Sequence, residues 1–267
     1  MTERERSLND EILYAVEGGI ATITLNRPQA RNALTFAMYE RIAEICRDPA
    51  AHGDPRVIVM TGAGEKAFGA GTDISQFRSF STGEDALAYE GRIETVIGTI
   101  ERCPVPTLAA ISGAVTGGGA SIALACDIRI ATVTARFGFP IARTLGNCLS
   151  MENYARLYAL LGPARVKDIV MTARLVEAEE GQRIGLYSEL LPDHAALMAR
   201  AGELAKTIAG HAPLTMRATK EAMRRLTGAA AEGLDGDDLV RLCYTSADFR
   251  EGMEAFLGKR PPVWQGR

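Results

Sequence analysis

This sequence lacks a long hydrophobic run, and it also lacks an apolar segment near its N-terminus. The longest apolar stretches, near Thr107–Ile111 and Ile122–Cys126, are far shorter than the ~20 residues that a membrane-spanning helix requires. The segment Met1–Asp10 is charged, and no apolar core follows it of the kind that a signal peptide has. We therefore expect a cytoplasmic protein with no membrane among its partners.

The sequence also has no excess of positive charge. Its 30 lysine and arginine residues stand against 33 aspartate and glutamate residues, which gives a formal net charge of -3. Proteins that bind nucleic acid neutralise its phosphates with lysine and arginine, so we expect no nucleic-acid partner. The chain of 267 residues is 47% hydrophobic and 24% charged, which is typical of a soluble globular protein and excludes a disordered or fibrous one. This length fits one large domain, or one domain with a small appendage.

Cysteine is scarce and has no pattern. The five cysteines are odd in number and none belongs to a C-x-x-C pair: Cys46, Cys103, Cys126, Cys148 and Cys243. This favours a reducing compartment and argues against a disulfide framework or a zinc site. No cluster of ligands suggests any other metal, so we expect no metal site.

The first half of the chain alternates between strand patterns and helix patterns. The predicted strands are Ile12–Val16, Ile20–Leu25, Val57–Met60, Leu108–Ile111 and Ile128–Ala131, and the predicted helices are Thr35–Cys46, Glu84–Arg102 and Ala120–Ala125. The first two strands flank Gly18-Gly19 and form a hairpin, whereas Val57–Met60 is apolar throughout, as in a strand buried on both faces. Such alternation predicts an α/β domain with a largely parallel sheet.

Beyond Ser150 the pattern is almost entirely helical. The predicted helices are Glu152–Leu161, Ala164–Thr172, Glu177–Gly185, Ala195–Ile208, Leu214–Arg225 and Gly236–Ser246. The last sixty or so residues form a separate helical segment, which must bury its apolar faces against the same chain or against a neighbouring subunit.

Glycines follow two of the predicted buried strands. Gly62, Gly64, Gly69 and Gly71 follow the first, and Gly113 with Gly117–Gly119 follows the second, directly before a helix. The first N–H groups of a helix have no partner within the helix, so two such loops could direct two backbone donors at one oxygen, as in an oxyanion hole. The same glycines would also suit tight turns and close packing of helix on sheet, and the pattern leaves both interpretations open.

The glycines also allow two other interpretations. The segment Gly62–Ala67 is a loose G-x-G-x-x-A of the dinucleotide-binding kind, but Phe68–Gly71 interrupts the helix that this motif requires. The segment Gly119–Ala123 resembles the G-x-S-x-G elbow of serine hydrolases, with Ser121 as the nucleophile. His194 and His211 are the histidines that follow Ser121 in the chain, so a serine hydrolase stays an alternative.

Several segments, in order along the chain, resemble the crotonase (enoyl-CoA hydratase/isomerase) superfamily. Ala67–Ile74 and Ala110–Gly119 are similar to its two signatures. Further similarities lie at Leu25–Pro28, Asn32–Leu34, Thr172–Arg174, Glu179-Glu180, Ile184–Leu186, Arg250–Phe256 and Lys259-Arg260. The resemblance implies an α/β fold, namely a crotonase-like spiral of ββα units with a C-terminal helical trimerisation segment. It divides the chain into a core of residues 1–205 and an oligomerisation segment of residues 206–267, assembled as a homotrimer or a dimer of trimers.

The resemblance also implies a substrate and a site. The substrate would be an acyl-CoA thioester, with coenzyme A entering as part of the substrate and no cofactor bound permanently. By motif position, the backbone N–H groups of Thr72 and Gly118 would hold the thioester carbonyl and stabilise an enolate. Coenzyme A would lie along Gln29, Ala30 and Arg31, and Lys259 of a neighbouring subunit would reach its phosphates.

The sequence departs from the family where the hydratases carry their two catalytic glutamates. Ser121 occupies one of these positions, Ile141 occupies the other, and Ser150 aligns with the aspartate of family isomerases. A serine hydroxyl needs another base to activate it, and isoleucine has no acid–base chemistry. The exact reaction is therefore open, although the resemblance implies a lyase or isomerase that acts on CoA thioesters.

Other residues are candidates for the acyl pocket. Glu152 would be the acid–base group of an isomerase, whereas Arg143 would orient the carboxylate of a substrate that loses CO₂. Lining positions are expected at Ala70, Asp73, Ser121, Ile141, Arg143, Asn147 and Ser150. A member of the family that binds acyl-CoA without turnover is a further alternative.

Overall fold

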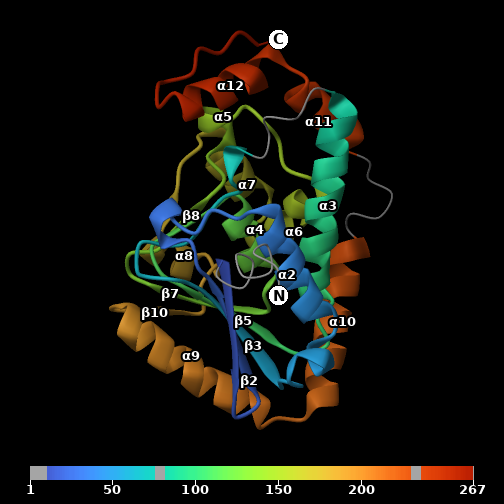
Figure 1. The fold of residues 1–267 in the computed structure, drawn as a ribbon, viewed down its shortest axis with the longest axis vertical. Coiled ribbons are helices and arrows are strands. Elements are labelled where there is room, and N and C mark those ends of the chain that lie inside the picture. The colour runs from blue at the N-terminus through green and yellow to red at the C-terminus, as the bar shows by residue number, and fades with distance from the viewer. Residues whose placement is uncertain (1–10, 76–81, 230–235, 267) are drawn as a thin grey trace, which may run out of the picture.

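The structure is a computed structural model that describes residues 11–75, 82–229 and 236–266 (Figure 1). The charged segment Met1–Asp10 lies outside these residues. No helix in the described part of the chain is long and apolar enough to cross a membrane.

A six-stranded sheet forms the centre of the molecule. Its order is β1 (Ile12–Glu17), β2 (Ile20–Leu25), β3 (Val57–Gly62), β5 (Thr107–Ile111), β7 (Ile128–Thr132) and β10 (Glu189–Leu191). The pair β1–β2 is antiparallel, which confirms the predicted hairpin, and the other neighbours are parallel. Every residue of β3 is buried, as its unbroken apolar run predicts.

A second, smaller sheet lies beside the first. It contains β4 (Ala67–Ala70), β6 (Ala114–Thr116), β8 (Arg136–Gly138) and β9 (Val176–Glu177). The prediction that glycine loops lead directly from strand to helix is therefore wrong, because β4 and β6 stand between them. The chain instead repeats a ββα unit: β3–β4–α3 (Gly83–Glu101), β5–β6–α4 (Gly118–Ala125) and β7–β8–α5 (Ile141–Thr144). This is the spiral that the family resemblance implies.

Helices cover both faces of the six-stranded sheet. On one face α2 (Phe36–Arg47), α3 and α4 enclose the main core, and Thr35 and Thr82 cap the first two of these helices. On the other face lies α9 (His194–Ala209), which buries Leu197, Ala201 and Ala205 against β3, β5 and β7 (Figure 1). The predicted helices at Thr35–Cys46 and Glu84–Arg102 are confirmed to within one residue at each end.

The remaining elements connect the core to the C-terminal helices. Two short 3-10 helices are η1 (Pro28–Ala30) and η2 (Pro49–His52), and the remaining α-helices are α6 (Met151–Leu161), α7 (Pro163–Met171), α8 (Ala178–Arg183), α10 (Pro213–Ala229), α11 (Asp237–Tyr244) and α12 (Ala247–Leu257). Helix α11 packs on α3, and α12 packs on α5, so the C-terminal segment folds back over its own core (Figure 1). Helix α9 runs through the predicted boundary at residue 205 and continues to Ala209.

Candidate active site

The glycines at the ends of β4 and β6 bring two loops into backbone contact. A Cβ atom on Gly119 would lie 2.2 Å from the carbonyl oxygen of Gly69, a distance that no side chain tolerates. A Cβ atom on Gly117 would lie 3.1 Å from the Cα atom of Gly71. The glycines therefore serve close packing, one of the two interpretations that the sequence left open, and this packing brings Thr72 next to Gly118.

Thr72 and Gly118 both present a backbone N–H group without a backbone partner in the described part of the chain. Leu34 forms a bridge with the first loop, in which its N–H donates to Gly71 O and its carbonyl accepts from Asp73 N, both at 2.8 Å. Neither of these two hydrogen bonds uses the N–H of Thr72, which lies between Gly71 and Asp73 in the chain. Gly118 begins α4, where N–H groups have no partner within the helix. A Cβ atom on Gly118 would lie 3.1 Å from Thr72 Oγ1, so the two donors belong to residues in contact.

Three hydroxyl groups gather beside these donors. The Oγ1 atom of Thr72 shares a hydrogen bond of 2.9 Å with the hydroxyl of Tyr39 on α2, and another of 3.0 Å with the hydroxyl of Tyr89 on α3. Burial raises the pKa of both tyrosines, so these groups are neutral hydroxyls at physiological pH. A Cβ atom on Gly118 would come within 1.8 Å of the Tyr39 hydroxyl, which therefore fills the space that a side chain at position 118 would take.

Helix α3 carries three glutamates on its side facing α6 and α11, and they differ in their partners. Arg156 of α6 donates to Glu94 Oε2 at 2.8 Å and to Glu101 Oε1 at 2.7 Å. Glu90 forms no ion pair in the described part of the chain and instead accepts a hydrogen bond from the Tyr244 hydroxyl of α11. Burial raises the pKa of Glu90 to about 7, and the charges of neighbouring glutamates add to this rise, although the hydrogen bond from Tyr244 opposes it.

The three positions where the family has carboxylates are occupied by uncharged side chains with local roles. Ser121 is buried in α4, and its hydroxyl donates to Gly117 O at 3.4 Å. Ile141 is buried at the start of α5, and the Ser150 side chain caps α6 by accepting from Asn153 N at 3.2 Å. Ser150 Oγ also donates to Glu94 Oε2 at 3.4 Å, but none of these three side chains is itself a proton acceptor for catalysis.

The serine hydrolase alternative finds no support in this arrangement. Ser121 has no histidine partner among the residues that the structure describes. His194 instead shares a hydrogen bond of 2.9 Å with the buried Ser112. His211 lies at the turn between α9 and α10, where its carbonyl oxygen accepts from Arg56. Ser121 therefore lacks the base that would activate it as a nucleophile.

The other predicted pocket residues lie in different environments. Glu152 is exposed in the first turn of α6, and Arg143 is exposed on α5. Asp73 is tied to Arg27 by an ion pair of 3.0 Å and accepts from Ser75, and these contacts lower its pKa despite partial burial. Asn147 donates to the Tyr244 hydroxyl at 3.1 Å, which places it beside Glu90.

The predicted coenzyme A residues fall into two groups. Gln29 and Ala30 lie in η1, and the carbonyl of Arg31 accepts from Ala70 N at 3.0 Å at the end of β4. This turn is held by Asn32, whose buried side chain donates to Ala67 O at 2.7 Å. It therefore lies beside the loop that carries Thr72. Lys259 is exposed after α12 and extends from a backbone with φ of 52°.

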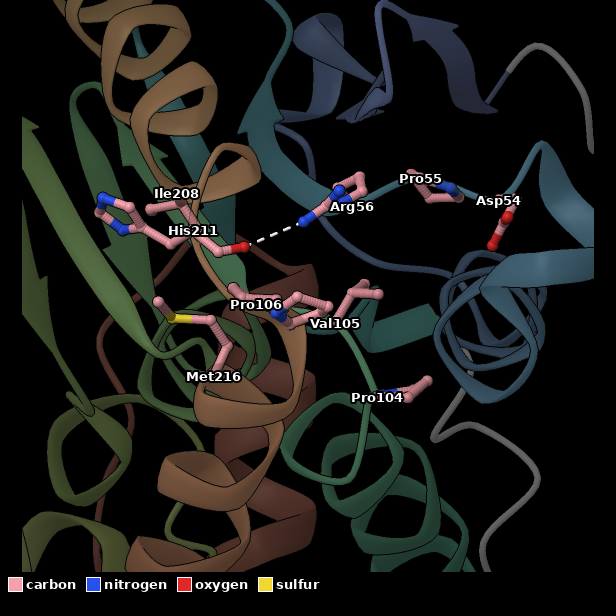
Figure 2. Close-up of a pocket in the computed structure, with 10 residues that line it drawn as sticks. Asp54, Pro55, Arg56, Pro104, Val105, Pro106, Ile208, His211 and Met216 are labelled. Atoms are coloured by element: carbon pink, nitrogen blue, oxygen red, sulfur yellow. Dashed lines mark hydrogen bonds between the residues drawn. The ribbon is translucent and has the colours of Figure 1, made fainter.

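Two hollows lie elsewhere in the molecule. One of about 240 Å³ is lined by the segments before β3 and β5 and by the turn between α9 and α10, where Arg56 donates to His211 O at 2.9 Å (Figure 2). It lies at the amino ends of parallel strands, whereas ligands of open α/β sheets bind at the carboxyl ends. A groove of about 760 Å³ is lined by α3, α6 and α10, and its wall includes Glu94, Glu101 and Glu152. No cluster of metal-ligating side chains occurs in the described ranges.

Sequence reasoning missed Glu90 and its partner Tyr244. Glu90, Glu94 and Glu101 are spaced by four and seven residues, so a helical projection would have placed them on one face beside the apolar stripe of α3. That pattern alone is typical of a helix face exposed to solvent. What distinguishes Glu90 is the packing of α11 over it, which no local pattern reveals.

Comparison with known proteins agrees with this geometry. The family model for enoyl-CoA hydratase/isomerase matches residues 15–267. A short-chain-enoyl-CoA hydratase of Clostridium acetobutylicum is 34% identical over 267 residues, covering 95% of this chain and 96% of the relative.

Solved structures show the same fold. An enoyl-CoA hydratase/carnithine racemase from Magnetospirillum magneticum superposes with a TM-score of 0.76 at 34% identity, covering 97% of this chain and 96% of the other. A methylmalonyl-CoA decarboxylase in complex with 2-nitronate-propionyl-CoA gives a TM-score of 0.85 at 26% identity, covering 96% of this chain and 99% of the other. The chain belongs to the enoyl-CoA hydratase/isomerase family of the crotonase superfamily.

Proposed function

We propose that this protein moves a proton at the α-carbon of an acyl-CoA thioester, through an enolate held by the backbone N–H groups of Thr72 and Gly118. Members of its family act on acyl-CoA thioesters, so the substrate class follows from the family. The observation that carries the proposal is the contact between two glycine loops whose N–H groups at Thr72 and Gly118 have no backbone partner in the described part of the chain.

The chemistry of the enolate explains why backbone donors matter. Removing the α-proton sends an electron pair onto the thioester oxygen, and N–H groups already fixed by the fold stabilise the negative charge that forms there. One such donor contributes about 10²–10³ in rate. Hydration through paired glutamates is not part of the proposal, because Ser121 and Ile141 occupy those positions. Isomerisation of an enoyl thioester needs only one proton carrier and fits the site better.

The coenzyme A portion would lie along Gln29, Ala30 and Arg31, because this turn is hydrogen-bonded to the end of β4 next to Thr72. No permanently bound cofactor or metal is proposed. Lys259 of a neighbouring subunit, in a homotrimer or a dimer of trimers, would bind the phosphates of coenzyme A. Large apolar side chains exposed on the C-terminal helices support such an assembly: Leu214, Met223, Leu226, Leu242 and Phe256. Residues 206–267 would then form the oligomerisation segment of a cytoplasmic enzyme.

Decarboxylation is a second candidate. Loss of CO₂ from a malonyl-type thioester generates the same enolate without a base, so the N–H groups of Thr72 and Gly118 would suffice for that step. The fold likeness to the methylmalonyl-CoA decarboxylase, with its TM-score of 0.85, supports this possibility. The enolate that remains would still need one proton.

Mass spectrometry of acyl-CoA thioesters incubated with the protein in D₂O tests the proposal. The panel contains a saturated, a 2-enoyl, a 3-enoyl and a malonyl-type thioester. We expect deuterium at the α-carbon and migration of the double bond, while loss of CO₂ would select the second candidate. Water addition as the main reaction would contradict the proposal. A panel returned unchanged would favour a family member that binds acyl-CoA without turnover.

A further inference from the structure

The three glutamates on α3 are not equivalent. Arg156, whose side chain is only 7% exposed, forms ion pairs with both Glu94 and Glu101, so these two carboxylates share one buried cation. Glu90 lies one turn further toward the N-terminus of α3 and forms no ion pair among the described residues. A carboxyl group shielded from water without a cation is costly as a structural element, which points to a role in function.

Hydrogen bonds and ring contacts connect Glu90 to the donor loop. The Tyr244 hydroxyl donates to Glu90 and accepts from Asn147 Nδ2 at 3.1 Å. The ring of Tyr244 lies 6.4 Å from that of Tyr89, whose hydroxyl bonds Thr72 Oγ1 at 3.0 Å. These contacts therefore connect the carboxyl group of Glu90, through Tyr244 and Tyr89, to the side chain of Thr72, and we call this connected set the polar wall.

This wall also retains an unused acceptor. The Oδ1 atom of Asn147 is buried and has no hydrogen-bond partner among the residues that the structure describes. Buried polar atoms without a partner are rare in proteins, so this free acceptor beside Tyr244 points to a donor on a bound ligand as its partner. Asn147 and Glu90 both bind the Tyr244 hydroxyl, so this free acceptor lies close to the Glu90 carboxyl group.

We propose that Glu90 is the acid–base residue of this enzyme, with Tyr244 and Asn147 as the positioning residues that hold its carboxyl group. The proposal rests on the proposed function and supplies the proton carrier that Ser121, Ile141 and Ser150 lack. It replaces Glu152, which is exposed in the first turn of α6.

The Glu90 carboxylate takes the α-proton of the thioester, so the C–H bond breaks and an O–H bond forms on Glu90. The electron pair of the C–H bond moves onto the carbonyl oxygen, where the N–H groups of Thr72 and Gly118 bind it. The protonated Glu90 then returns its proton, either to the α-carbon or, in an enoyl thioester, to the γ-carbon. No oxidant or second reactant enters.

The surroundings of Glu90 set the pH at which this step operates. The titratable groups that face it are Tyr39 of α2, Tyr89 and Glu94 of α3, Cys148 before α6, Glu152 of α6 and Tyr244 of α11. Burial and the two neighbouring glutamates hold the pKa of Glu90 at about 7. A group with this pKa exists in both protonation states near neutral pH, as a proton carrier must.

The test is the rate of α-deuteration of a saturated acyl-CoA in D₂O between pH 5 and 9. For the unmodified protein we expect kcat/KM to rise with pH and to level off above a midpoint near 7, because only the ionised carboxylate accepts the proton. Glu90→Gln should slow exchange by at least 10²-fold while calorimetric binding of the same thioester persists. Glu90→Asp should restore part of the rate, and Glu17→Gln, an exposed change on β1, is the matched control.

Tyr244→Phe gives a readout that a structural role would not produce. Removing the hydrogen bond that Tyr244 donates should move the midpoint of the pH profile upward, because this bond lowers the pKa of Glu90. It also serves if Glu90→Gln does not fold. Exchange in Glu90→Gln at the unmodified rate, or an unshifted midpoint in Tyr244→Phe, would overturn the assignment of Glu90. No exchange by the unmodified protein would instead overturn the proposed function and this inference with it.

Discussion

The candidate site has a backbone side, which supplies N–H donors, and a side-chain side, which supplies a proton carrier, and the two differ in how closely they match the family. On the backbone side, the loops around Thr72 and Gly118 have the glycines and the helix start that the family motifs place there, and the two N–H groups have no backbone partner among the described residues. On the side-chain side, the positions at Ser121 and Ile141 have no carboxylate, and a shielded carboxyl group with no ion pair among the described residues stands on a different helix, at Glu90.

This difference has a physical basis. The backbone donors are produced by the fold itself, since two loops can approach this closely only where Cβ atoms are absent. A proton carrier needs only reach and a suitable pKa, so it can move to any element that lines the same space. The fold of such a protein therefore predicts enolate stabilisation better than it predicts the reaction that follows.

The largest expected effect comes from removing a donor on the backbone side. Gly118→Pro deletes the N–H group, and Gly118→Ala keeps it while adding the same Cβ atom against the Tyr39 hydroxyl. We expect α-deuteration to fall about 10³-fold further in the proline variant than in the alanine variant. Equal rates in the two variants, measured by mass spectrometry in D₂O, would show that the N–H of Gly118 does not stabilise the enolate.

On the side-chain side, the free energy of unfolding tests the ion pairs that Glu94 and Glu101 form with Arg156. Arg156→Met removes the cation that Glu94 and Glu101 share, and we expect the free energy of unfolding to fall by about 3 kcal/mol, because both carboxylates are partly exposed and the cost is at the lower end for such pairs. Urea denaturation measures this, with the exposed Arg143→Met as control. A loss no greater than in the control would mean that Glu94 and Glu101 resemble Glu90 after all.

For Glu90 we expect the opposite effect, because removing its charge should stabilise the folded protein. Its pKa in the folded protein is about 7, above the ordinary value of 4.5, so the unfolded chain releases this proton first as the pH rises. The folded state therefore loses stability between about pH 4.5 and 7, and Glu90→Gln removes that loss.

We expect Glu90→Gln to gain about 1–2 kcal/mol relative to the unmodified protein at pH 8, but little at pH 4.5. Calorimetric melting at the two pH values measures the difference. A gain of the same size at both would contradict a raised pKa for Glu90.

The smallest effect separates the backbone of Thr72 from its side chain. Thr72→Val keeps the N–H group and the shape but removes the hydroxyl that Tyr39 and Tyr89 share. We expect kcat/KM to fall only about 3-fold, together with about 1 kcal/mol of stability from the lost hydrogen bonds. A loss of kcat/KM as large as in Gly118→Pro would mean that the hydroxyl cluster, and not the backbone N–H groups, stabilises the enolate.

The sequence predicted elements whose cause is local. The hairpin at β1–β2, the amphipathic α2 and the fully apolar β3 each follow from a pattern within the segment itself. The strands β4 and β6 were missed because they are short, rich in glycine and alanine, and stabilised by pairing with each other across a long separation in the chain. Whether these two strands form therefore depends on contacts between distant parts of the chain, which a short stretch of sequence does not show.

The site divides in the same way. Thr72 and Gly118 could be predicted as candidate donors because motifs identify a backbone position whatever the side chain. Glu90 was not found, because its special character arises from Tyr244 and from the absence of a cation, both of which depend on how α11 packs on α3. Glu152 was expected instead, since it lies in the loop region where the family carries its acids, but it is exposed.

The central claim is that the N–H groups of Thr72 and Gly118 bind the thioester oxygen, and infrared spectroscopy of a bound acyl-CoA labelled with ¹³C at the thioester carbonyl tests it most directly. Two hydrogen bonds to the oxygen weaken the C=O bond, so we predict that its stretching band moves to lower frequency in the unmodified protein and moves back in Gly118→Pro. A band that stays at its solution frequency on binding to the unmodified protein would contradict the claim.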